Sequence, residues 1–172
     1  MAGEMTSEKL LILVRHAKSS WNDLGLSDRD RPLNKRGRRD APDMARRLSR
    51  LPQCPERIVT SPACRALSTA EVLAAEFGLG PEAIQIEETL YEAGPMDVFR
   101  VVHGLNNRLG CAMLVGHNPG LTQTVNDLAN VAIENVPTCG VAILRFEIGS
   151  WTEVRDRSAT LVDFDYPKKV FT

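Results

Sequence analysis

The sequence predicts an α/β fold: a single three-layer α/β/α domain with a mostly parallel central sheet. Short apolar runs such as Leu10–Val14 and Cys111–Val115 are typical of strands buried on both faces. Helical segments separate these runs, as in folds built from strand–helix–strand units. The 172 residues, 43% hydrophobic and 25% charged, suit one domain with a substantial core. We therefore expect one domain over residues 1–172, with a flexible N-terminus at residues 1–8.

The bulk properties exclude several functional classes. The net charge of -1 gives no indication of nucleic acid or a membrane surface as partner. No apolar run approaches the ~18 residues of a membrane span, and the first run is too short for a signal peptide. The four cysteines are widely spaced and predict reduced thiols, and the three histidines lack metal-ligand spacing. We expect a cytoplasmic protein without metal or cofactor; the oligomeric state is not predicted.

The first predicted strand, Leu10–Val14, runs directly into Arg15 and His16. In open α/β sheets the ligand crevice lies beyond the carboxyl ends of the strands. A guanidinium beside an imidazole suits a phosphoryl group, because the arginine binds its oxygens and the ring nitrogen can attack phosphorus. On these residues alone, a basic strand end pointing into water is an equal alternative.

A polar loop, Ser19–Asn34, separates this strand from the first helix. Asn34 is a good N-cap for a helix from Lys35 to about Leu51. One face of that helix is apolar, and we expect most of its arginines to form a solvated face. Which basic residues between positions 29 and 50 touch a substrate is left open.

The second strand, Arg57–Thr60, leads into a helix that we expect to begin at Ser61-Pro62, with serine as its cap. Arg65 then falls in the first turn, at the sheet edge of Arg15 if the two strands are parallel. The helix N-terminus adds partial positive charge there. This geometry predicts a second cation facing a phosphate.

The remaining chain continues the alternation of strands and helices. A loop carrying Glu92 follows the third strand, and His117 directly follows the fourth. Two histidines at the ends of two apolar strands indicate a shared pocket. The further elements that we expect are strands at 83–87, 111–115 and 141–146, helices at 96–105 and 121–128, and a final edge strand over 151–164.

Three motifs resemble the histidine phosphatase superfamily, which includes phosphoglycerate mutases, and most closely its SixA-type phosphohistidine phosphatases. They are Leu13–Ser19 with Trp21-Asn22, Thr60–Ala66, and Val115–Gly120. Asp30–Leu33 with Arg36-Gly37 is also similar to the SixA-like branch. Together, in this order, the motifs are far more specific than any one alone. The resemblance implies a phosphoglycerate mutase-like fold.

The resemblance also implies roles for individual residues. His16 would be the nucleophile that becomes a phosphohistidine. Arg15 and Arg65 would clamp the phosphoryl oxygens, and His117 would donate a hydrogen bond to them. Asn22 matches a phosphate-contacting asparagine, and Glu92 falls loosely where many members carry a general acid. The expected activity is metal-independent hydrolysis of a phosphorylated protein or small molecule.

Ala17 and Lys18 stand where mutase-like members usually have Gly-Glu, which favours the SixA-like branch. If Glu92 is not an acid, a phosphohistidine substrate is favoured, because its imidazole can be protonated before it departs. A phosphatase or mutase acting on a small phosphorylated metabolite is the alternative within the superfamily.

Two alternatives come from other classes. Cys139 and Arg145 have the Cys-x5-Arg spacing of cysteine phosphatases, but the residues between them predict a strand instead of a phosphate-binding loop. A non-catalytic module that binds phosphorylated ligands is the other, and the presence of His16 favours an enzyme over it.

Overall fold

The six-stranded sheet places the strands that carry the predicted site next to one another. The computed structural model describes residues 7–52 and 54–169, and its strand order is β3-β2-β4-β1-β5-β6. Strands β1 to β4 run parallel, β5 is antiparallel to β1, and β6 is antiparallel to β5. The mostly parallel sheet is confirmed. The strands are β1 (Glu8–Arg15), β2 (Arg57–Thr60), β3 (Ile84–Ile86), β4 (Cys111–Gly116), β5 (Val141–Glu147) and β6 (Ala159–Asp165).

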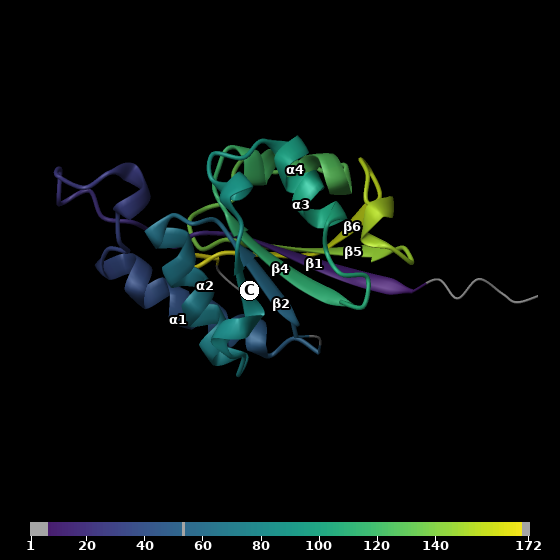
Figure 1. The fold of residues 1–172 in the computed structure, drawn as a ribbon, viewed down its shortest axis with the longest axis horizontal. Coiled ribbons are helices and arrows are strands. Elements are labelled where there is room, and N and C mark those ends of the chain that lie inside the picture. The colour runs from purple at the N-terminus through teal and green to yellow at the C-terminus, as the bar shows by residue number, and fades with distance from the viewer. Residues whose placement is uncertain (1–6, 53, 170–172) are drawn as a thin grey trace, which may run out of the picture.

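Helices cover both faces of the sheet, which confirms the three layers (Figure 1). Helices α1 (Lys35–Ser49) and α2 (Cys64–Glu76) lie on one face, and α3 (Pro95–His103) and α4 (Gly120–Ala129) lie on the other. Short 3-10 turns occupy 28–30, 81–83, 88–90 and 151–153. Within the described ranges, no helix is both long and apolar enough to cross a bilayer.

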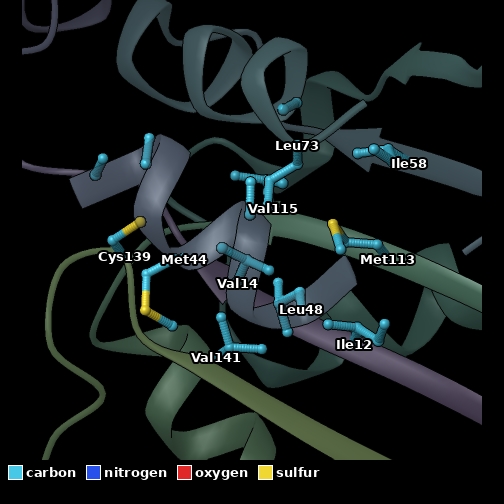
Figure 2. Close-up of a cluster of buried hydrophobic side chains, with 14 of the residues drawn as sticks. Ile12, Val14, Met44, Leu48, Ile58, Leu73, Met113, Val115, Cys139 and Val141 are labelled. Atoms are coloured by element: carbon cyan, nitrogen blue, oxygen red, sulfur yellow. The ribbon is translucent and has the colours of Figure 1, made fainter. Parts of the chain in front are cut away.

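Strand β1 shows why its sequence is apolar at consecutive positions. Ile12 and Val14 pack into the cluster beneath α1 and α2 (Figure 2), while Leu11 and Leu13 pack against α3 and α4. Since successive side chains of a strand point to opposite faces, a strand between two helical layers must be apolar at every position. The central strand that carries Arg15 is therefore anchored on both sides.

Helix α1 begins as predicted. The side chain of Asn34 accepts a hydrogen bond from Gly37 N at 2.8 Å. A Cβ atom at Gly37 would lie 2.2 Å from Lys18 O, so this position needs glycine for the close approach of the helix to the chain after β1. The Arg36-Gly37 motif thus helps to place the residues that follow His16.

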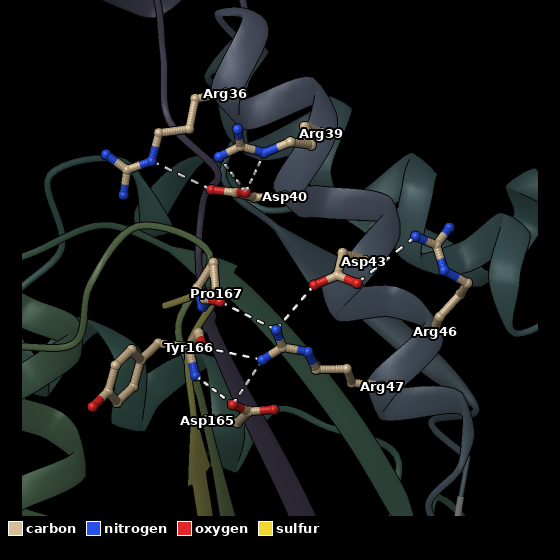
Figure 3. Close-up of polar contacts among 9 residues, drawn as sticks. All are labelled: Arg36, Arg39, Asp40, Asp43, Arg46, Arg47, Asp165, Tyr166 and Pro167. Atoms are coloured by element: carbon tan, nitrogen blue, oxygen red, sulfur yellow. Dashed lines mark hydrogen bonds and ion pairs between the residues drawn. The ribbon is translucent and has the colours of Figure 1, made fainter. Parts of the chain in front are cut away.

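The arginines of α1 are not all a solvated face. Figure 3 shows Arg47 linking the helix to the chain beyond β6: its guanidinium pairs with Asp43 and Asp165 and donates to the carbonyls of Tyr166 and Pro167. Only a quarter of its side chain is exposed. This arginine ties the C-terminal end of the described chain to the first helix.

Several expected boundaries were wrong. Helix α2 starts at Cys64 with Ala63 as N-cap residue, not at Ser61-Pro62. The final strand begins at Ala159, because residues 151–153 form a 3-10 turn. Strand β1 begins at Glu8, inside the segment expected to be flexible, and Ser7 Oγ donates to Ile148 O; residues 1–6 lie outside the described chain.

Candidate active site

Arg15 and His16 lie at the carboxyl end of β1, where the backbone is held from two sides. The amide of His16 donates to Gly116 O at the end of β4 (3.1 Å), and the amide of Arg15 donates to Gly140 O (3.0 Å). The amide of Cys139 donates back to Arg15 O at 3.0 Å. Both residues are therefore fixed by main-chain contacts from segments about a hundred or more positions away.

The hydrogen bonds of His16 define its tautomer. Its Nδ1 lies 2.8 Å from Ala17 O, and a carbonyl oxygen can only accept. The proton of the neutral ring is therefore on Nδ1, which leaves a lone pair on Nε2. The pKa of His16 is lowered to about 3, chiefly by burial and further by the charges of His117, Arg65 and Arg15, against a raising contribution from the hydrogen bond to Ala17 O. The ring is thus neutral at physiological pH, with an unprotonated Nε2.

His117 follows β4 and lies directly beside His16. The two ring centroids are 5.0 Å apart. His117 Nε2 lies 2.7 Å from Ser61 Oγ, which already accepts a hydrogen bond from Ala63 N. The Ser61 hydroxyl has a proton that it can donate to Nε2, and with that donation the proton of the neutral His117 ring is on Nδ1. Ser61, expected to cap a helix, instead orients this second imidazole.

The two predicted arginines both act on this histidine pair. The pKa of His117 is lowered to about 4, chiefly by burial and also by the charges of Arg65 and Arg15, opposed by Asp28. Arg65 comes from the first turn of α2 and is only 7% exposed. Since β1, β4 and β2 are parallel neighbours, their carboxyl ends bring the two imidazoles and two guanidinium groups to one sheet edge.

Two buried nitrogen atoms at this edge lack a partner. Across the described ranges, Arg15 Nε and His117 Nδ1 are the buried side-chain nitrogen or oxygen atoms without a hydrogen bond. Arg15 otherwise donates through Nη1 to Val136 O at 3.0 Å. Buried donors are normally satisfied, and each unmet one costs about 1–3 kcal/mol. Two unpartnered buried nitrogen atoms, one of them on Arg15 and the other on His117 near the charge of Arg65, therefore favour a bound anion.

Asn22 and Glu92 are exposed, in contrast to the buried His16 and Arg65. Asn22 lies on the exposed segment 21–30 and lines an open hollow with Asn34 and three basic residues at the start of α1. Glu92 is exposed and has a positive φ of 55°. Their predicted contacts with substrate remain predictions.

Three residues that the sequence analysis did not assign to the site contact its members: Ser61, Asp28 and Tyr91. The edge of the Tyr91 ring packs on His117, with centroids 5.7 Å apart. Its hydroxyl donates to the carboxylate of Asp28 at 2.6 Å, and Arg65 donates to the same oxygen at 3.0 Å. Ser61 could have been found from its place directly after a buried strand; Asp28 and Tyr91 carry no comparable signal.

Neither a metal site nor a cysteine nucleophile is built from the described residues. No group of three or more His, Cys, Asp or Glu side chains among them gathers closely enough to hold a metal ion. Residues 141–147 form β5, so the backbone between Cys139 and Arg145 is paired with β1 and β6. Burial raises the pKa of the Cys139 thiol to about 12. The Cys-x5-Arg spacing therefore does not form a phosphate-binding loop.

The neutral histidines predict acid sensitivity of folding. Below pH 6.5 the unfolded chain protonates both imidazoles, whereas the folded chain does so only near pH 4 and 3. The free energy of unfolding therefore falls with falling pH, by about 2 kcal/mol per histidine at pH 5. Urea denaturation at pH 7 and pH 5 measures this, in a range above the ordinary titration of carboxylates.

The variant His16→Gln should lose about half of that pH dependence, since one of the two groups is gone. The matched control is His103→Gln, which changes the last residue of α3, a histidine hydrogen-bonded to Val154 O. This variant should keep the pH dependence of the unmodified protein. Equal stability of the unmodified protein at both pH values would contradict neutral burial of the pair.

Comparison with known proteins agrees with the sequence motifs and the fold. The family model described as histidine phosphatase superfamily (branch 1) matches residues 11–98. An uncharacterized chloroplastic protein from Arabidopsis thaliana is 35% identical over 151 residues, which cover 83% of this chain and 69% of the plant protein. An uncharacterized protein from Mycobacterium tuberculosis is 32% identical over 165 residues, which cover 90% of this chain and all of the other.

A solved structure shows that the likeness in fold covers most of the chain. A protein from Agrobacterium tumefaciens assigned as the phosphohistidine phosphatase SixA superimposes with a TM-score of 0.78 at 26% identity. The superposition covers 92% of this chain and 98% of the other. The likeness therefore extends over nearly the whole of both chains.

Proposed function

Because the chain belongs to the histidine phosphatase superfamily, a family of phosphoryl-transfer enzymes, we propose that this phosphatase hydrolyses phosphohistidine on a protein through a covalent intermediate on His16. The observation that carries the proposal is the pairing of a neutral imidazole with two unmet N–H donors, Arg15 Nε and His117 Nδ1. A nucleophile and an anion site share one edge of the sheet.

The first chemical step forms a bond between His16 Nε2 and phosphorus. The bond from phosphorus to the substrate nitrogen breaks, and its electron pair returns to the substrate imidazole, which carries a proton when it departs. Arg15, Arg65 and His117 donate hydrogen bonds to the phosphoryl oxygens as charge moves through the in-line transition state. The Nδ1 proton, held by Ala17 O, keeps the attacking nitrogen free.

In the second step, water attacks the phosphoryl group on His16. The bond from phosphorus to Nε2 breaks, its electron pair returns to the ring, and inorganic phosphate leaves. Two smaller barriers thus replace one large barrier. The negative charge of the phosphoryl group opposes the neighbouring cations, so His117 is better able to carry a proton while substrate is bound.

The choice of phosphohistidine follows from the proton donors near the pocket. An alkyl phosphate ester needs an acid to protonate its leaving oxygen, while a phosphoimidazole can be protonated in solution first. Glu92 is exposed, and the Tyr91 hydroxyl proton is committed to Asp28, which raises the pKa of that tyrosine. These contacts support a substrate whose leaving group brings its own proton.

Parallel assays test this substrate class. We expect kcat/KM for a phosphohistidine peptide to exceed that for sugar phosphates by at least about tenfold, because only the former leaves without an enzyme acid. Release of inorganic phosphate measures both. Equal or faster turnover of sugar phosphates would favour a metabolite phosphatase, and binding of phosphate analogues without any turnover would favour a non-catalytic module. A cytoplasmic location remains part of the proposal.

A further inference from the structure

Asp28 accepts hydrogen bonds from three side chains near the histidine pair. Its Oδ2 accepts from Arg65 Nη2 at 3.0 Å and from the Tyr91 hydroxyl at 2.6 Å, and its Oδ1 accepts from Arg31 Nη1 at 2.9 Å. Its backbone oxygen accepts from Arg65 Nη1 at 2.6 Å. These contacts join the loop after β1 to α2 and to the turn before α3, across separations of 37 and 63 positions.

The donors that hold Asp28 are themselves well fixed. The side chains of Arg65 and Arg31 are 9% and 8% exposed, whereas that of Asp28 is 46% exposed. Arg31 also donates to Ser20 O at 3.0 Å and to the Ser19 hydroxyl, and its guanidinium stacks on Trp21. The carboxylate is therefore partly exposed to solvent, while the two arginines that hold it are buried.

Asp28 is also the carboxylate that acts on the reactive pair. The charges acting on His117 come from Arg65 on α2, Arg15 on β1 and Asp28 on the 3-10 turn, and the Tyr91 ring packs on its edge. The hydrogen bonds from Tyr91, Arg65 and Arg31 hold the pKa of Asp28 well below its usual range. An aspartate so held stays ionised and cannot act as a general acid at neutral pH.

We propose that Asp28 is a specificity-determining residue, whose fixed negative charge beside Arg65 stabilises the protonated, positively charged imidazole of the substrate and disfavours a negatively charged leaving oxygen. This inference rests on the proposed function and names what selects phosphohistidine. When the P–N bond breaks, its electron pair goes to the substrate ring, which departs as neutral imidazole after carrying one extra proton through the transition state. Before the bond breaks, that extra proton gives the ring a positive charge, and the carboxylate favours this protonated form of the substrate over the neutral form.

The variant Asp28→Asn tests the role of this charge through the ratio of kcat/KM values for two substrates. The two substrates are a phosphohistidine peptide and p-nitrophenyl phosphate, whose leaving group is an anion. We expect the ratio of their kcat/KM values to fall about tenfold in the variant, because removing one negative charge acts with opposite sign on the two leaving groups. Loss of positioning alone, through Arg65, would lower both values and leave the ratio unchanged.

Two further variants complete the test. Asp28→Glu retains the charge and should recover most of the ratio even if its longer side chain lowers both rates. Asp30→Asn changes a carboxylate of the same 3-10 turn that accepts a hydrogen bond from the Ser27 hydroxyl at 2.8 Å. It is the matched control and should keep the ratio of the unmodified protein. Thermal unfolding of each variant establishes that it is folded.

The possible failures are distinguishable. An unchanged ratio in Asp28→Asn, with the unmodified protein still preferring phosphohistidine, would overturn the role of Asp28 and leave the proposed function standing. A ratio that falls in Asp28→Asn and equally in Asp28→Glu would also overturn it, because charge would not be the cause. If the unmodified protein turns over the ester but not phosphohistidine, the proposed function itself fails.

Discussion

We expect the replacement of His16 with alanine to lower kcat/KM by about 10⁴-fold or more on every substrate, because the proposed acceptor of the phosphoryl group is gone. The remaining arginines and His117 should still bind phosphate, without a nucleophile to attack it. The unmodified protein, exposed briefly to phosphohistidine peptide and quenched in alkali, should carry phosphate at His16 that is stable to base and labile to acid. Mass mapping of the labelled peptide identifies the site.

His103→Ala is the matched control for this experiment. That histidine lies at the end of α3, with its Nε2 against Val154 O, outside the cluster of His16 and His117. We expect it to retain both turnover and labelling. Residual activity in His16→Ala within tenfold of the unmodified protein, or label on another residue, would show that the covalent route does not pass through His16.

Replacing Arg65 with alanine should lower kcat/KM by about 10³-fold. Its guanidinium is buried at the start of α2, and its charge acts on both His16 and His117. A fixed cation that meets developing negative charge in phosphoryl transfer is worth several powers of ten. Steady-state kinetics with p-nitrophenyl phosphate measures the loss, and Arg65→Lys should recover only part of it, because an ammonium lacks the planar fork.

Arg100→Ala is the control, since that arginine on α3 has a side chain 74% exposed and pairs only with Asp97 at 3.1 Å among the ion pairs of the described chain. Its activity should match that of the unmodified protein. A loss of less than tenfold in Arg65→Ala would contradict the proposed contact between this guanidinium and the phosphoryl group.

The strand ends were predictable from sequence because burial on both faces leaves a plain signal. Leu10–Val14 and Cys111–Val115 are apolar at every position, so the end of each strand and the polar residues after it could be placed within about one residue. Parallel neighbours bring such ends to one edge, which is why Arg15, His16 and His117 could be grouped before any geometry was known.

The start of α2 was mispredicted for a physical reason. Ser61-Pro62 has the composition of a helix start, but the Ser61 hydroxyl lies against His117 Nε2, and the first helical residue is Cys64. The preference of serine for the N-cap position predicted a bond to the helix backbone, whereas the Ser61 side chain contacts His117. Such conflicts between local preference and tertiary use are expected at functional sites.

Asp28 could not be assigned from sequence, because its partners are set by loop geometry. The segment 21–30 is exposed throughout and has no periodic pattern, and Arg65 and Tyr91 reach it from distant parts of the chain. Nothing in its composition distinguishes Asp28 from Asp23 or Asp30. Only the folded arrangement shows which of these carboxylates faces the pocket.

The main-chain bonds around Arg15 and His16 have a consequence for how substrates of different size are accommodated. Gly116 on one side and Cys139-Gly140 on the other hold the backbone of Arg15 and His16 in place. The stretch 21–30, which projects from the body at the left of Figure 1, is tethered mainly through side chains. Under the proposed function, substrates of different size would therefore be accommodated by movement of this segment, while His16 keeps one position.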